Sequence, residues 1–407
     1  MNRLDDNIAS KKRIASIGVI LLGIVSLLGD IIYEGARGII PSYLDYLGAS
    51  AVLIGLIGGF GDFIGYGLRL ISGYLADSTR AYWAFIFIGY GLIAAIPFLA
   101  MPLGLEMAIL LVLAERVGKA FRSPSRDTVL SFISKDVGTG KAFGFHELLD
   151  QVGAIIGPLL VSIFIGFSTG NYSITFGVFS IPFLLLVMVM AYTRKRIDPL
   201  IRAVLEKPGS EKRTNRLGKS FYAYALAVLL NTAGLIPASL ILFKATKIVE
   251  PIGLLWFVPI IYLIIQAIDA PMAMVSGVLY DKYGTKVLVS SFLLSFLPAT
   301  FAMMTQQLPS LLVAAVIFGI VLGMQESIYR AAVADFAPVP SRGFAYGIFN
   351  LVYGSGFVLG GAVFGAFMDW GTPFALSAVY TCIVQSMAIV MLLKSRSSRK
   401  SQIEHPA

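Results

Sequence analysis

Charge is scarce in this sequence. Only 14% of the 407 residues are Asp, Glu, Lys or Arg, whereas 57% are hydrophobic and the mean hydropathy is +0.82. Soluble globular chains carry about 25% charged residues, so this composition excludes an ordinary soluble protein. Apolar runs of about 20 residues recur along the chain, each long enough to cross a hydrocarbon core of roughly 30 Å as a helix. The dyad alternation of membrane barrels is missing. We therefore expect an all-α polytopic membrane protein.

Residues that support metal, redox or covalent chemistry are also few. Cys382 is the one cysteine, so no disulfide within the chain is possible, and its apolar surroundings indicate a packing role. The two histidines, His146 and His405, cannot form a zinc site with a single thiol. The sequence has no nucleophile–base constellation and no Gly-x4-Gly-Lys-[Ser/Thr] loop. We expect a protein that is not an enzyme, has no cofactor or metal, and is driven by an ion gradient, H⁺ first, rather than by ATP.

The net charge of +9 has a particular location. Nine Lys or Arg residues lie between positions 194 and 219 against three acidic residues, and others lie near both ends of the chain. They flank apolar runs, which is typical of residues that keep cytoplasmic loops inside. The charge therefore predicts a plasma-membrane protein with both termini in the cytoplasm, and it does not predict nucleic-acid binding.

The apolar runs predict twelve spans in two halves. We expect an N-terminal bundle at 1–193, a polar cytoplasmic linker at 194–219, a C-terminal bundle at 220–394 and a cytoplasmic tail at 395–407. The first run should stay in the mature chain, because it is longer than a signal-peptide core and no small-residue cleavage site follows. The expected partners are the lipid bilayer and a small-molecule substrate, and the protein is expected to be a monomer. The predicted spans are 14–38, 51–76, 81–102, 107–133, 141–168, 172–193, 221–243, 252–280, 286–305, 309–334, 342–367 and 372–393.

The two halves repeat. Ser-Gly-Tyr-Leu-Ala-Asp at 72–77 recurs as Ser-Gly-Val-Leu-Tyr-Asp at 276–281, an offset of 204. Arg-x-x-Val at 126–129 recurs at 330–333, and three glycines at 144, 153 and 157 recur at 347, 356 and 360. With six spans in each copy, both halves have the same orientation and are related by an axis along the membrane normal. This arrangement predicts a transporter with its site between the halves, near mid-membrane.

These motifs resemble those of the major facilitator superfamily (MFS), in its prokaryotic twelve-span form, over about residues 14–393. The segment 73–80 is similar to the family's Gly-x-Leu-x-Asp-[Arg/Lys]-x-Gly-[Arg/Lys] loop signature, and 277–286 matches it more fully. The fifth span resembles the glycine signature of the family's antiporters, although small residues four apart also let helices pack closely. Its members here are Gly144, Gly153, Gly157 and Pro158.

The resemblance implies an inner gate at the cytoplasmic ends of spans two and eight. There a carboxylate would cap a neighbouring helix or pair with an arginine. Asp77 and Asp281 are the expected carboxylates, with Arg126 and Arg330 as their natural partners, and a simple cap without a role in gating is the alternative. The other gate residues are Gly73, Asp127, Gly277, Lys282 and Gly284.

The fourth predicted span carries six ionisable residues in thirteen positions. At roughly 100° per residue, four of them fall on one narrow arc of a helix. Charged groups at membrane depth face a protein interior or a water-filled cavity. These residues therefore either line the transport cavity and bind substrate or pair only with one another. They are Glu115, Arg116, Lys119, Arg122, Arg126 and Asp127.

The first span holds Asp30, Glu34 and Arg37 on one helical face. This face is otherwise apolar, so the two carboxylates are expected to look into the central cavity, with Arg37 at the extracellular rim. Asp30 lies deeper and is the first candidate for a proton-coupling group.

Two further carboxylates lie in spans two and five. Asp62 could pair with Lys119 or Arg116, as a structural pair or as a proton site. Asp150 could neutralise Arg122 or Lys119. The second half is poorer in charge, and its cavity candidates are Asn231, Gln266, Asp269 and Glu326.

We interpret the chain as a secondary active transporter that works by alternating access. The glycine signature and the embedded carboxylates favour proton-coupled antiport that exports small, partly hydrophobic compounds. The main alternative is proton-coupled symport or facilitated uptake of a small organic anion, with Arg116, Lys119 and Arg122 as ligands. A membrane receptor or scaffold without transport activity is the alternative from another class.

Overall fold

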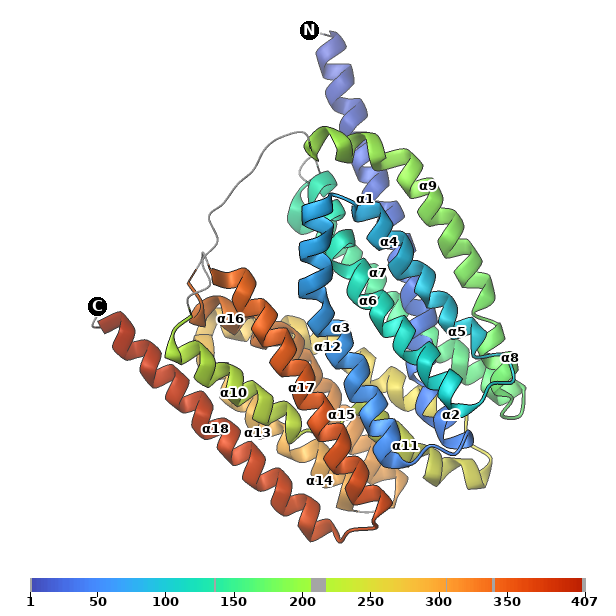
Figure 1. Ribbon diagram of the computed structural model, residues 1–407, viewed down its shortest axis with the longest axis vertical. Helices are drawn as coiled ribbons and strands as arrows, with labels where there is room; N and C mark the ends of the chain where they lie inside the picture. Colours follow the sequence, from blue (N-terminus) through green and yellow to red (C-terminus); the bar gives the residue numbers. More distant parts are fainter. Residues whose placement is uncertain (1, 135–136, 206–216, 305, 339–340, 405–407) are drawn as a thin grey trace. The chain divides into compact units, whose positions relative to one another are not determined.

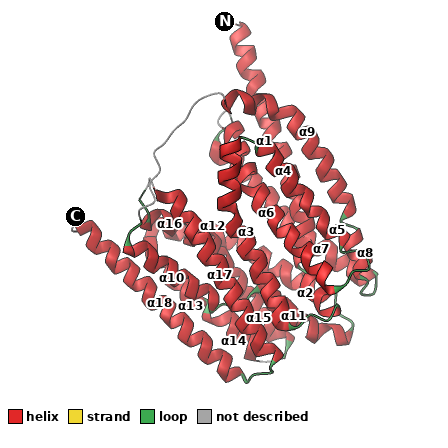
Figure 2. Cartoon of the chain, viewed as in Figure 1, coloured by secondary structure: helices red, strands yellow, loops and turns green. Residues whose placement is uncertain are grey.

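Helices account for the regular structure of this computed structural model. It describes residues 2–134, 137–205, 217–304, 306–338 and 341–404, and no strand occurs in these ranges (Figure 2). The first part of the chain contains α1 (Asn2–Arg37), α2 (Ile40–Tyr46), α3 (Ala51–Thr79), α4 (Tyr82–Gly91), η1 (Leu92–Ala94), α5 (Ala95–Phe98), α6 (Leu105–Ser134), α7 (Thr139–Phe167), α8 (Tyr172–Gly177) and α9 (Ser180–Leu205).

The second part of the chain is helical as well within the residues that the structure describes. Figure 1 labels α15 and α16, and the π-helical turn η4 joins these two helices. These elements are α10 (Lys219–Ala233), α11 (Ala238–Val249), η2 (Glu250–Ile252), α12 (Phe257–Tyr283), η3 (Gly284–Lys286), α13 (Val287–Leu294), α14 (Phe296–Met304), α15 (Leu308–Met324), η4 (Gln325–Tyr329), α16 (Arg330–Phe336), α17 (Arg342–Asp369) and α18 (Phe374–Glu404).

The chain divides into two compact units. Unit 1 comprises Met1–Ala36 and Leu68–Glu211, and unit 2 comprises Arg37–Gly67 and Lys212–Ala407. The segment 37–67 thus groups with unit 2, although the sequence-based division places it in the first bundle. The predicted bundle boundaries stay a prediction. In the predicted linker, α9 continues to Leu205, and positions 206–216 lie outside the described residues.

Nine helical stretches within the described ranges are long and apolar enough to cross a membrane, and the run Tyr82–Phe98 is a shorter apolar helix. The helix α6 has the necessary length but is not among the nine, because the charged residues at 115–127 make it too polar. Helices occupy each of the twelve predicted ranges. The structure differs from the sequence-based expectation in two places.

The first difference concerns the predicted span at 221–243. Here α10 ends at Ala233 and α11 begins at Ala238, after Pro237, whose backbone is extended and has no amide hydrogen to continue a helix. Lys244 follows the predicted end of this span at 243, but the helix continues beyond it. This lysine lies within α11, is buried, and donates a hydrogen bond to the carbonyl oxygen of Ala302.

The second difference concerns the predicted tail at 395–407. Here α18 continues without a break to Glu404, so the described part of the tail is helical.

Glycine allows two helices of unit 1 to approach at backbone distance. A Cβ atom on Gly157 of α7 would lie 2.7 Å from the backbone nitrogen of Gly35 on α1, and one on Gly153 would lie 2.7 Å from Cβ of Asp30. A Cβ atom on Gly144, earlier on α7, would have no neighbouring heavy atom within 4 Å. Pro158 lies inside α7 without ending it. The close contact between α1 and α7 therefore depends on Gly153 and Gly157 and not on Gly144.

Unit 2 uses glycine in the same way. Gly356 and Gly360 of α17 pack against the end of α10 and the residues after it, where a Cβ atom on Gly360 would lie 2.8 Å from the carbonyl oxygen of Leu235. The start of α3 is also fixed to α17, because the carboxylate of Asp369 accepts hydrogen bonds from the backbone nitrogens of Ala51 (2.8 Å) and Val52 (2.9 Å). A carboxylate is favourable there because the first amides of a helix have no partner within it.

The glycine contact predicts different effects of alanine at two positions of α7. Gly157→Ala should lower stability by about 1–3 kcal/mol, because the new methyl group meets backbone atoms of α1 that cannot move aside. Gly144→Ala is the matched control and should be neutral or stabilising by up to about 1 kcal/mol, since alanine is the better helix former. Thermal unfolding of the purified protein in detergent measures both. Equal losses of stability at the two positions would show that the close packing of α1 against α7 does not determine the effect of the added methyl group.

Candidate functional site

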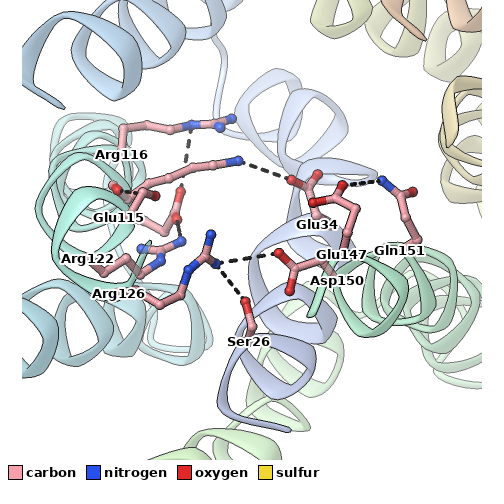
Figure 3. A network of polar contacts seen from close by, with 11 residues as sticks. Ser26, Glu34, Glu115, Arg116, Arg122, Arg126, Glu147, Asp150 and Gln151 are labelled. Atoms are coloured by element: carbon pink, nitrogen blue, oxygen red, sulfur yellow. Dashed lines mark hydrogen bonds and ion pairs between the residues drawn. The ribbon is translucent and has the colours of Figure 1, made fainter. Parts of the chain in front are cut away.

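The ionisable side chains of unit 1 gather where α6 faces α1 and α7. Figure 3 shows Glu115, Arg116, Arg122 and Arg126 on α6, with their side chains directed toward residues of the other two helices. We define the charge cluster as nine residues: Asp30 and Glu34 of α1, Asp150 of α7, and Glu115, Arg116, Lys119, Arg122, Arg126 and Asp127 of α6.

The most deeply buried part of the cluster is an ion pair within α6. The carboxylate of Glu115 lies 3.0 Å from Nη2 of Arg122, two helical turns further on, and 3.7 Å from Nε of Arg116. The exposed fraction is 2% for both Glu115 and Arg122. Breaking such a pair would leave a charge without compensation in a medium of low polarity.

Arg122 is enclosed on its remaining sides. Its Nη1 donates a hydrogen bond to the carbonyl oxygen of Gly89 on α4 at 3.3 Å. Its guanidinium group lies 4.7 Å from the ring centroid of Tyr33 and 5.4 Å from that of Tyr90. The close approach of α4 needs Gly89, because a Cβ atom there would meet the backbone of Arg122. Arg122 is therefore occupied by partners from three helices.

Lys119 links α6 to α1. Its Nζ lies 3.5 Å from Oε1 of Glu34 and 4.7 Å from the ring centroid of Tyr33. The Lys119 side chain is 21% exposed and that of Glu34 is 6% exposed. Arg116 and Lys119 thus have Glu115 and Glu34 as carboxylate partners, and the predicted pairing with Asp62 stays a prediction.

Arg126 links α6 to both α1 and α7. Its guanidinium group contacts Asp127 at 2.9 Å, Asp150 at 3.5 Å and the hydroxyl of Ser26 at 2.8 Å (Figure 3). His146 adds a contact to the same carboxylate of Asp150 at 3.4 Å. The predicted pairing of Asp150 with Arg122 or Lys119 is wrong, because Asp150 faces the next turn of α6.

The predicted gate residues differ in their surroundings. Asp77 is exposed and accepts a hydrogen bond from the hydroxyl of Tyr82 at 3.0 Å, whereas its expected partner Arg126 lies in the charge cluster. Arg330 lies with its guanidinium group 5.7 Å from the ring centroid of Tyr66.

The remaining gate residues lie around the ends of α3 and α12. Asp281 and Lys282 are exposed at the end of α12, and Gly284 ends that helix with a positive φ of 60°. Positions with φ in this range favour glycine. A Cβ atom on Gly73 would lie 3.4 Å from Pro124, and one on Gly277 would lie 3.2 Å from the hydroxyl of Ser327.

Asp30 is the exception within the cluster. It is 5% exposed and lies against Gly153 of α7, and no cation comes within ion-pair distance of it in the described part of the chain. Its electrostatic neighbours include two other acids, Asp150 and Glu34, besides Lys119. The cluster holds five carboxylates and four cations, an excess of one negative charge when all are ionised. Asp30 is the carboxylate without an ion pair.

Unit 2 contains a neutral network instead. Asn231 donates to Gln385 at 2.8 Å and accepts from Tyr329 at 2.8 Å and Gln325 at 3.3 Å. Gln325 in turn accepts from Tyr353 at 3.0 Å. Sequence reasoning identified Asn231 but missed Gln385 and Tyr329. The sequence feature that could have identified Gln385 is its position as a polar amide side chain within the apolar run of α18. All three other C-half candidates are on helices: Gln266 and Asp269 are buried on α12, and Glu326 is half-buried in η4.

Metal binding has no support from the arrangement. Within the residues that the structure describes, no three His, Cys, Asp or Glu side chains come together as a metal site requires.

Comparison with known proteins gives a consistent result. The family model described as Major Facilitator Superfamily matches residues 22–286 and 225–407. An uncharacterized protein of Mycobacterium tuberculosis is 35% identical over 387 residues, which cover 94% of this chain and 93% of that protein. An uncharacterized MFS-type transporter of Methanocaldococcus jannaschii is 26% identical over 348 residues, covering 83% of this chain and 84% of that protein.

Solved structures show the same fold. The nucleoside transporter NupG has a TM-score of 0.71 at 15% identity, covering 92% of this chain and 98% of that chain. The peptide transporter POT in complex with sulfate has a TM-score of 0.72 at 16% identity, covering 95% and 97%. The prediction of an all-α, multi-pass membrane protein with this fold is confirmed. The chain is a membrane transporter that belongs to the major facilitator superfamily.

Proposed function

We propose that this transporter works as a proton-coupled antiporter of the plasma membrane and exports small, partly hydrophobic compounds by alternating access. Both termini would lie in the cytoplasm, since basic residues concentrate in the linker and near the chain ends. The observation that carries the proposal is Asp30, a buried carboxylate without an ion pair beside a cluster that has one excess negative charge.

The excess charge favours protonation. An ionised carboxylate in a medium of low polarity is costly unless a cation or several hydrogen-bond donors compensate it. Each of the other four carboxylates in the cluster has a cation within 4 Å. Protonation of Asp30 would make the cluster neutral. A cationic substrate approaching the same region would favour release of this proton, and that exchange is the basis of antiport.

The packing around Asp30 offers a way to couple the proton to conformation. Gly153 places the backbone of α7 directly against Asp30. A shift of α7 relative to α1 would therefore change which groups surround this carboxylate. Changes in surroundings of this kind alter proton affinity, so proton release and helix movement would occur together.

The contacts of the basic residues argue against the organic-anion alternative. Arg122 is enclosed by Glu115, Gly89 and two tyrosine rings, and Lys119 lies beside Glu34. An anionic substrate would have to displace these carboxylates, and the region already has more negative than positive charge. A cationic or neutral substrate meets no such obstacle.

We predict that Asp30→Asn abolishes proton-coupled transport. Proteoliposomes with an imposed proton gradient and an internal pH dye would receive either tetraphenylphosphonium or benzoate. In the unmodified protein the cation should drive proton movement, and in Asp30→Asn this signal should disappear. Exchange of labelled for unlabelled cation without a gradient should persist in the variant, because asparagine keeps the volume of the side chain and removes only the exchangeable proton.

The control is Glu106→Gln, which neutralises an exposed carboxylate in the first turn of α6. It should leave proton movement unchanged. Proton movement driven by benzoate and lost in Lys119→Gln would instead support anion uptake and overturn the export proposal.

A second prediction tests whether Arg122 only pairs with Glu115 or also binds substrate. Glu115→Gln should lower stability by about 3–5 kcal/mol, because it leaves the buried Arg122 without its carboxylate. The double variant Glu115→Gln/Arg122→Gln should regain most of this stability and should still transport the cation. Thermal unfolding and the same proteoliposome assay measure the two properties. A double variant that is stable but inactive would identify Arg122 as part of the substrate site.

A further inference from the structure

A half-buried carboxylate lies inside one of the membrane-length stretches of unit 2. Glu326 belongs to η4, the π-helical turn within the apolar stretch Leu308–Phe336. A charged side chain at such a position is costly unless it faces a protein interior or a water-filled cavity. Single π-helical turns inside longer helices occur frequently at functional sites. A partner that compensates the charge of Glu326 is therefore expected.

Glu326 forms no ion pair in the part of the chain that the structure describes. In an α-helix, Arg330 would face it four positions further on, but the π-helical turn changes this spacing. The guanidinium group of Arg330 instead lies 5.7 Å from the ring centroid of Tyr66 on α3. Glu326 and Arg330 are both electrostatic neighbours of Tyr353 on α17. The carboxylate thus lies near charged and aromatic groups without an ion pair to a described residue.

The π-helical turn has a buried side and a partly exposed side. Gln325 and Tyr329 are buried, and both donate hydrogen bonds to Asn231 of α10, at 3.3 and 2.8 Å. Tyr353 donates to Gln325 at 3.0 Å, so this side of the turn is held in place by two other helices. Glu326 lies on the other side and is half-buried. Because an unpaired carboxylate is unfavourable against lipid, its exposed part faces water.

These surroundings suit a cationic ligand. A carboxylate in a medium of low polarity attracts a cation strongly, because little solvent screens the pair. The half-buried ring of Tyr66 lies 5.3 Å from that of Tyr353, between centroids, and adds aromatic surface to the surroundings of the carboxylate. Aromatic surfaces are favourable contacts for organic cations. A compound with one positive charge and an apolar body matches both features.

We propose that Glu326 is the counter-charge that binds the positive group of the transported compound, an organic cation with one positive charge and an apolar body. This inference rests on the proposed export of small, partly hydrophobic compounds, and it names their charge. It does not rest on the role of Asp30 in proton exchange.

Binding of labelled tetraphenylphosphonium to the purified full-length protein in detergent tests the proposal. Glu326→Gln should weaken this binding by about tenfold or more, because it removes a charge–charge attraction and keeps the size of the side chain. Glu326→Asp keeps the charge and should retain part of the affinity. Labelled triphenylphosphine oxide is a neutral compound of similar shape. Its affinity should be the same in the unmodified protein and in Glu326→Gln.

The matched control is Glu250→Gln, which neutralises an exposed carboxylate in η2 of the same unit. It should leave the affinities for both compounds unchanged. Equal tetraphenylphosphonium affinity in Glu326→Gln and the unmodified protein would overturn the assignment of Glu326 and leave the export proposal intact. Absence of tetraphenylphosphonium binding to the unmodified protein would overturn both.

Thermal unfolding separates a binding role of Glu326 from a structural one. Since its carboxylate has no ion pair with a described residue, Glu326→Gln should not lower the unfolding temperature. A lower unfolding temperature, together with an equal loss of affinity for the neutral compound, would show that the carboxylate supports the π-helical turn instead of binding a cation, and the proposal would be wrong.

Discussion

The cost of burying charge is the constraint on which unit 1 depends. A helix with six ionisable groups in thirteen positions is stable inside a membrane protein only if neighbouring helices supply compensating charges. In α6, Glu115 provides part of this compensation from the same helix, and α1 and α7 provide the rest through Glu34 and Asp150. Those two helices must therefore lie close to α6 and to each other. The glycines of α7 meet this requirement, so helix packing and charge compensation are parts of one arrangement.

The two halves of the sequence repeat use the same backbone contact for different polar groups. Gly153 and Gly157 bring α7 against α1, and their counterparts Gly356 and Gly360 bring α17 against α10. In unit 1 the groups nearby are charged, whereas in unit 2 they are the amides and hydroxyls around Asn231. A neutral network whose donors and acceptors are paired has no charge to exchange. Beside these glycine contacts, the charged groups are consequently those of unit 1.

The sequence predicted the helices better than the contacts between them. Apolar runs and breaking residues are local signals, and they located α3, α7 and α17 almost to the residue. The partner of a charged side chain depends on how each helix is rotated and how far it slides along its neighbour, which no local pattern determines. Asp150 illustrates this, because a difference of one turn on α6 changes its partner from Arg122 to Arg126. The predicted span 221–243 ends just before Lys244 for a related reason, since a positive charge in a hydrophobic sequence indicates a helix end unless a buried carbonyl accepts its hydrogen bond.

The ion pairs of the charge cluster also differ in how they respond to movement. Glu115 and Arg122 lie on the same helix, so their separation is fixed by helical geometry and survives any rigid displacement of α6. The pairs of Lys119 with Glu34 and of Arg126 with Asp150 join different helices, and a displacement of about an ångström would weaken them. Asp30 has the carboxylates of both pairs, Glu34 and Asp150, among its electrostatic neighbours. A cation freed from either pair would have Asp30 as its nearest uncompensated carboxylate. The proposed proton coupling therefore needs no separate device for moving protons, because rearranging the interhelical pairs would change the charge that Asp30 experiences.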